Sequence, residues 1–162
     1  MNRISQQKLL NAVFYNVYGT EFCSTNMDDK VMLQKAVFLM REQGVLCGDY
    51  EFVWDQYGPF SAELSDDMKM EIEEDDSQKL VEFSPEALTI MERLKKVFTC
   101  ETAYSVRCWA ETIASLFYLR QYMYPSYDDE KIIEVLERKK SNLRNHEENV
   151  KAMNVLNDIL IA

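Results

Sequence analysis

The chain has 162 residues, of which 47% are apolar and 12% aromatic, enough for a single domain with its own core. Its nine methionines and its aromatic content argue against disorder. A formal net charge of −10 argues against a nucleic-acid binder, although a local basic patch is compatible with an acidic whole.

Four cysteines and a single histidine offer little material for a metal site. The cysteines contain no CxxC pair and show no other metal-ligand spacing. No apolar signal region opens the chain, and no segment reaches the roughly 18 uninterrupted apolar residues of a membrane span. We therefore expect a cytoplasmic protein without a metal, another cofactor or a membrane partner. We also expect its cysteines to be free and packed, namely Cys23, Cys47, Cys100 and Cys108.

The first part of the chain is predicted to form two amphipathic helices, over residues 6–18 and 27–43. Gly19 and Gly44 follow them, as is common at helix C-termini. Apolar residues extend almost round the second helix, so we expect it to be buried on several sides. A short strand over residues 50–54 is predicted next.

The least ordinary stretch, residues 52–61, gathers aromatic side chains, a Gly-Pro pair and a hydroxyl. Tyr57-Gly58-Pro59 predicts a turn, because glycine tolerates backbone angles that other residues avoid and proline fixes its own φ. Pro59 is expected in the first turn of a third helix, from Phe60 to about Met70, where its missing N–H costs nothing.

An acidic run over residues 71–76 is interpreted as a solvated helix end or loop. The less favoured interpretation is that it repels nucleic acid or attracts a basic partner. A second short strand is predicted over 79–83, and Ser84-Pro85 should begin a helix that ends near Phe98. This order of helices and strands is typical of winged-helix-like domains.

The last part of the chain is predicted to be helical. Residues 105–123 form the most hydrophobic segment and should be the central core helix, which Pro125 ends. A further helix is expected from residue 128 to about 140, and a final one from Glu147. The predicted fold class is therefore mainly α: one compact helical domain over residues 1–162, with one or two short strands and a winged-helix-like order.

The sequence offers little for catalysis. The only histidine, His146, lies in a polar stretch and is expected on the surface, and a Cys–His pair has no local support. Asp55 stands out among the carboxylates because Trp54 and Tyr57 flank it, and a buried acid has a raised pKa. We favour a structural role, in which Asp55 caps the turn or pairs with a base such as Lys35.

Trp54, Tyr57 and Phe60 form an aromatic set with two interpretations. Such a set most often fastens a turn onto the core. The alternative is a partly exposed patch in which Tyr and Trp act as binding anchors.

Two segments together resemble a known pattern. Leu33-Gln34-Lys35-Ala36-Val37-Phe38-Leu39, followed by Tyr57-Gly58-Pro59-Phe60-Ser61 and Glu63-Leu64, resembles the motif of YwgA-like bacterial proteins. It is more distantly similar to the SocA-like Panacea antitoxin domains. The tail, from Ile113-Ala114-Ser115-Leu116 to Arg138-Lys139-Lys140, has a similar order. The resemblance implies a compact helical domain with a regulatory role: an antitoxin, or an adaptor that presents a protein to a protease.

The first hypothesis is a non-enzymatic regulatory module that binds another protein, for which a basic toxin would suit the acidic chain. The partner-binding residues it predicts are Gln34, Lys35, Trp54, Asp55, Tyr57, Phe60 and Ser61. The second is a winged-helix nucleic-acid-binding regulator that uses either the basic group Arg138, Lys139, Lys140 and Arg144 or the helix after Tyr57-Gly58-Pro59. An enzyme with a carboxylate site at Asp55 is the third. The oligomeric state stays open.

Overall fold

The structure is a computed structural model that describes residues 3–69 and 81–161. Most of these residues are helical, which confirms the predicted compact, mainly α-helical fold class. The α-helices are α1 (Arg3–Tyr18), α2 (Met27–Glu42), α3 (Ala62–Met68), α5 (Pro85–Phe98), α6 (Val106–Tyr118), α7 (Asp129–Lys139) and α8 (His146–Val155). Two short π-helical segments follow α6 and α8, η1 (Leu119–Met123) and η2 (Leu156–Ile161).

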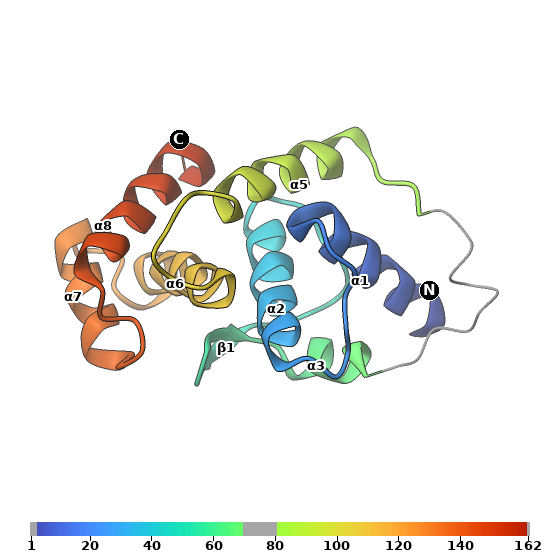
Figure 1. The fold of residues 1–162 in the computed structure, drawn as a ribbon, viewed down its shortest axis with the longest axis horizontal. Helices are drawn as coiled ribbons and strands as arrows, with labels where there is room; N and C mark the ends of the chain where they lie inside the picture. Colours follow the sequence, from blue (N-terminus) through green and yellow to red (C-terminus); the bar gives the residue numbers. More distant parts are fainter. Residues whose placement is uncertain (1–2, 70–80, 162) are drawn as a thin grey trace.

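Helix α2 occupies the centre of the molecule, between α1 and α6 (Figure 1). Every residue from Val31 to Met40 is buried, as the apolar pattern around this helix predicts. Helix α5 packs along α1, while α7 and α8 lie beyond α6, at the other end of the molecule (Figure 1). Trp109 of α6 is fully buried, and its indole N–H donates to the carbonyl oxygen of Val97 over 2.8 Å. The sequence predicted the segment of α6 as the central core helix, and in the structure α2 and α6 share this role.

Short polar side chains start all the described α-helices after α1. In these six cases an oxygen of the residue before the helix accepts a hydrogen bond from a backbone N–H of the first turn, which satisfies a donor that has no partner within the helix. The capping residues are Asn26, Ser61, Ser84, Asp128, Asn145 and, for α6, Ser105. Ser84-Pro85 begins α5 as predicted.

The sheet is a hairpin of two three-residue strands, β1 (Val53–Asp55) and β2 (Gly58–Phe60). They pair antiparallel, with Trp54 opposite Pro59. The prediction that Pro59 opens the third helix is therefore wrong: Pro59 lies in a strand, and α3 begins only at Ala62. Proline is tolerated here because an edge strand can lack one ladder hydrogen bond.

The predicted second strand is placed differently in the structure. Residues 81–83 form no strand, and positions 79 and 80 lie outside the described residues, as does the acidic run 71–76. Within the described ranges both strands precede α3, whereas the winged-helix-like order placed one on each side of it. The predicted central helix extends as far as expected, to Met123, but its last five residues form the π-helical segment η1 in place of an α-helix.

All four cysteines are free, but they are not all packed. Cys47 is buried and two others are half-buried, whereas Cys23 is exposed, which corrects the prediction for that residue. Over residues 3–69 and 81–161, no helix is both long and apolar enough to cross a membrane. The same residues contain no group of three or more His, Cys, Asp or Glu side chains placed to hold a metal ion.

Candidate functional site

The hairpin is fixed to α2 through the side chain of Gln34. Its amide nitrogen donates to the carbonyl oxygen of Ser61 over 2.9 Å, and its amide oxygen accepts from the backbone N–H of Ser61, also over 2.9 Å. Gln34 and Ser61 are both buried, so these bonds satisfy backbone groups that water cannot reach. The Ser61 hydroxyl remains available to cap α3, where it accepts from the N–H of Leu64.

Lys35, the next residue of α2, binds the same hairpin. Its side chain is only 1% exposed, and its Nζ donates to the carbonyl oxygen of Pro59 over 2.8 Å. Burial lowers the pKa of Lys35 to about 7, because an ammonium group loses its hydration inside the protein. The negative charges of Glu111 and Asp55 act in the opposite direction, and Lys140 adds to the lowering.

Lys140 reaches the hairpin from the other side, at the end of α7. Its Nζ donates to the carbonyl oxygen of Asp55 over 3.1 Å and also to that of Gln56. The same Nζ lies 5.0 Å from the centre of the Trp54 ring. Lys140 is 6% exposed, so the prediction that it contributes to a nucleic-acid-binding surface is wrong. Burial lowers its pKa.

Glu111 of α6 supplies the negative charge beside these two lysines. It is fully buried, its Oε1 lies 3.9 Å from Lys140 Nζ, and its Oε2 accepts from the amide of Asn142. Burial raises the pKa of Glu111, while Lys140 and Lys35 act in the opposite direction. We call Gln34, Lys35, Glu111 and Lys140 the polar clamp.

Gly58 allows the hairpin to lie close to α6. Its φ is +89°, a left-handed conformation that favours glycine. A Cβ at this position would collide with the hydroxyl oxygen of Ser115. That hydroxyl is buried and has no hydrogen-bond partner among the described residues.

The outer side of the hairpin is open to solvent. Val53 is 59% exposed, and Asp55 and Gln56 are also exposed. Three aromatic side chains are half-buried around them, and an Arg107 guanidinium lies 5.7 Å from the centre of the Tyr57 ring. We call this surface the hairpin face: Val53, Trp54, Asp55, Gln56, Tyr57 and Phe60.

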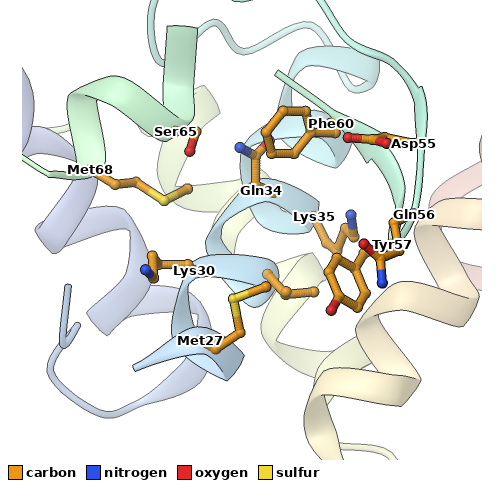
Figure 2. A pocket seen from close by; sticks show the side chains of 11 residues that line it. Met27, Lys30, Gln34, Lys35, Asp55, Gln56, Tyr57, Phe60, Ser65 and Met68 are labelled. Atoms are coloured by element: carbon orange, nitrogen blue, oxygen red, sulfur yellow. The ribbon is translucent and has the colours of Figure 1, made fainter. Parts of the chain in front are cut away.

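A pocket of about 170 Å³ opens beside the hairpin face, between the first half of α2, the hairpin and α3. Figure 2 shows its lining, with side chains from all three elements directed towards one space. Its apolar lining consists of Met27, Val31, Tyr57, Phe60 and Met68. Gln34 and Lys35 also line it, and their polar ends are bonded to the hairpin backbone.

The structure brings all the predicted partner-binding residues together around the hairpin. Gln34, Lys35 and Ser61 are buried, so in this fold they support the surface from beneath. The other four, Trp54, Asp55, Tyr57 and Phe60, belong to the hairpin face. Asp55 is exposed, and the predicted pair with Lys35 is not formed, because Lys35 donates to the carbonyl oxygen of Pro59.

The residues of the alternative nucleic-acid site lie near the end of α7. Arg138, Lys139 and Arg144 are exposed, and Arg144 Nε donates to the carbonyl oxygen of Glu137. Glu134 and Glu137 line the same shallow hollow as the two arginines. With Lys140 buried and these acids interspersed, the surface carries charges of both signs.

His146 is exposed, as predicted, and its Nδ1 lies 2.9 Å from a carboxylate oxygen of Glu137. Sequence reasoning missed Glu111 and Lys140 as partners of the hairpin. Glu111 gave a usable signal, since it is the only acid in the most hydrophobic helix that the sequence predicts. Lys140 gave none, because bases are common at a helix C-terminus.

We compared the chain with protein-family models, with curated proteins and with solved structures, and none of the three comparisons found a match.

Proposed function

We propose that this chain is a non-catalytic regulatory module that binds another protein through the hairpin face. The observation that carries the proposal is the polar clamp. Lys35 and Lys140 bind the backbone of Asp55, Gln56 and Pro59, and Gln34 binds that of Ser61 directly after the hairpin, so that the hairpin is held at its turn, in β2 and at its end. The side chains on the other side of the same hairpin remain open to solvent.

The clamp is a costly way to fix a turn. Burying an ammonium or a carboxylate group costs several kcal/mol per ion, which hydrogen bonds and opposite charges only partly offset. A hairpin of two three-residue strands has little stability of its own. What the clamp adds is a defined position for the hairpin, since hydrogen bonds are directional whereas apolar contacts are not.

A fixed hairpin suits binding. A surface that is already ordered avoids the roughly 0.5–1.5 kcal/mol per side chain that ordering costs on association. The hairpin face also has a suitable composition, because Trp and Tyr residues with a hydrogen-bonding end are the usual anchors of interfaces.

Lys35 is the group closest to a catalytic property, since an amine with a pKa of about 7 can act as a base or nucleophile. Its Nζ is bonded to the Pro59 carbonyl, which favours a structural role. The resemblance to YwgA-like and SocA-like proteins also supports a regulatory role. The partner we propose is a basic protein in the cytoplasm, such as the toxin of an antitoxin or the substrate of a proteolytic adaptor.

Affinity purification of the intact chain from its native host, at low salt, tests the proposal. The Val53→Ser, Gln56→Ala variant removes exposed parts of the hairpin face, and Leu88→Ser, Asn154→Ala is the matched control on exposed parts of α5 and α8. We expect one stoichiometric protein partner, retained by the control and lost by the hairpin variant. Co-purifying nucleic acid that moderate salt removes would contradict the proposal and favour the nucleic-acid-binding alternative.

A further inference from the structure

The pocket beside the hairpin face has the size of a single side chain. Its volume is about 170 Å³, and an apolar cavity of roughly 150 Å³ is enough to hold benzene. A leucine, methionine or phenylalanine side chain therefore fits, whereas a cofactor or a nucleotide does not.

The lining of the pocket favours an apolar occupant. Gln34 and Lys35 already use their polar ends, because Gln34 binds both backbone groups of Ser61 and Lys35 binds Pro59. The other polar residues of the lining are Lys30, Asp55, Gln56 and Ser65. The remaining lining includes Met27, which is 49% exposed at the mouth, and Met68, which is 1% exposed. Methionines adapt their shape to different apolar side chains and are common at surfaces that bind several partners.

The charge around the pocket is mainly negative. Asp55, Glu63 and Asp66 are exposed on the hairpin and α3. The segments around the pocket, residues 27–35, 53–60 and 62–69, carry as acids Asp28, Asp29, Asp55, Glu63, Asp66 and Asp67, and as lysines Lys30, Lys35 and Lys69. Lys30 lines the pocket itself, and Asp28 lies 3.3 Å from Arg107 of α6. Lys35 is buried, and Lys69 lies 3.9 Å from Asp66. An incoming chain that carries positive charge is therefore attracted to this surface and an acidic one is repelled.

We infer that the pocket anchors one apolar side chain of a protein segment in which lysines or arginines flank that residue. The inference rests on the proposed function and specifies the chemistry of the partner. The apolar side chain would fill the space between Met27, Tyr57 and Met68, while the flanking bases would lie near Asp55, Glu63 and Asp66. This arrangement explains why an acidic domain keeps a small apolar pocket at its surface.

The probe for this inference is a phage-displayed library of random dodecapeptides, selected on the immobilised intact chain. We expect the enriched peptides to share one leucine, methionine or phenylalanine with lysine or arginine close to it. Enriched peptides that are acidic or lack an apolar anchor would overturn the inference. So would a failure to enrich any peptide above the background on an unrelated acidic domain.

A synthetic copy of the most enriched peptide then tests the pocket itself. Ser65→Trp places a large ring in the pocket from α3, and Thr89→Trp places the same ring on the exposed side of α5 as a control. We expect Ser65→Trp to weaken binding by roughly tenfold or more, as loss of a buried anchor does. Met27→Ala, at the mouth of the pocket, should weaken binding less and keeps the test valid if Ser65→Trp folds poorly. Binding that neither variant weakens would overturn the inference.

The charged rim is tested separately. Asp55→Asn, Glu63→Gln, Asp66→Asn should slow association of the peptide and reduce the effect of salt on it. The control, Glu92→Gln, Glu130→Gln, Glu134→Gln, removes as many exposed acids from α5 and α7. Equal effects of the two triple variants would show that only the overall charge matters and would overturn the role of the rim.

The two proposals can fail separately. If the natural partner is lost by the Val53→Ser, Gln56→Ala variant but binds the Ser65→Trp variant normally, the proposed function stands and the anchor pocket fails. If the pocket binds only a second copy of the chain, sedimentation of the wild type should show a dimer that Ser65→Trp disrupts, and this too would overturn the inference.

Discussion

Two neighbouring turns of α2 are buried in different ways: Phe38 lies against aromatic rings, whereas Gln34 and Lys35 lie against the backbone of residues 59–61. Phe38 packs edge-on against Phe52 and Phe117, with ring centres 5.3 and 6.0 Å away. Gln34 and Lys35, one turn earlier, are equally buried but reach backbone carbonyls instead. Apolar packing stabilises without fixing directions, and hydrogen bonds fix directions at a net gain of only about 1 kcal/mol each. The same helix thus contributes apolar side chains to the core and, through Gln34 and Lys35, fixes the position of the hairpin.

The largest loss of stability is expected at Phe38. Phe38→Ala removes a fully buried ring and should lower the free energy of unfolding by about 4 kcal/mol. The loss should be the same at neutral and at mildly alkaline pH, because no titrating group is removed. Urea denaturation at both pH values measures it. A loss that depends strongly on pH would show that the packing of Phe38 is coupled to the buried charge of Lys35, one turn earlier.

A smaller loss is expected when the polar clamp loses its carboxylate. Glu111→Gln keeps the shape of the side chain but leaves Lys35 and Lys140 without their buried counter-charge, which should cost about 3 kcal/mol. The matched control is Glu134→Gln, at an exposed position of α7, which should change stability by less than about 0.5 kcal/mol. Urea denaturation compares the two variants. Equal effects would mean that the buried charges do not depend on Glu111.

The close contact between hairpin and α6 can be tested with two glycines. Both Gly58 and Gly44 have a left-handed φ, but only Gly58 lies against another side chain, Ser115. Gly44→Ala should cost about 1 kcal/mol for the backbone alone, and Gly58→Ala roughly 2.5 kcal/mol because of the added collision. Thermal and urea unfolding give both values.

Ser115→Ala serves as the control for that comparison. Alone it should be close to neutral, since the Ser115 hydroxyl has no hydrogen-bond partner among the described residues. Combined with Gly58→Ala it should return the loss to the size of Gly44→Ala. A double variant as unstable as Gly58→Ala alone would exclude the Ser115 collision as the cause.

The smallest of these effects is a pH dependence from Lys35. Its pKa is about 7 in the folded chain, against the usual lysine pKa of 10.5. Between these values the unfolded chain binds more protons than the folded one, so the free energy of unfolding rises with pH. Below about pH 7 Lys35 is protonated in both states, and it no longer makes the free energy of unfolding depend on pH. Between about pH 7 and 9 the wild type should gain about 2 kcal/mol relative to Lys35→Met. A constant difference across this range would contradict a lowered pKa.

The sequence predicted the helices well because their apolar spacing and capping residues are local signals. The hairpin was only half predicted, since Pro59 suits the first turn of a helix as well as an edge strand, and only its partner Trp54 decides between them. The two segments that carry the family resemblance meet in space, through Gln34 with Ser61 and Lys35 with Pro59. Glu111 gave a signal that was not used, whereas the contribution of Lys140 could not be predicted, because its burial depends on packing between segments that are distant in the sequence.

The central claim, that the hairpin face binds a partner, is tested most directly by the affinity of the co-purified partner for two tyrosine variants. Tyr57 and Tyr127 are both partly exposed, and each has a cation 5.7 Å from its ring centre, Arg107 and Lys131 respectively. Calorimetric titration should show that Tyr57→Ala weakens binding by roughly tenfold or more, while Tyr127→Ala leaves it unchanged. Equal affinities for both variants, with both folded, would contradict the claim.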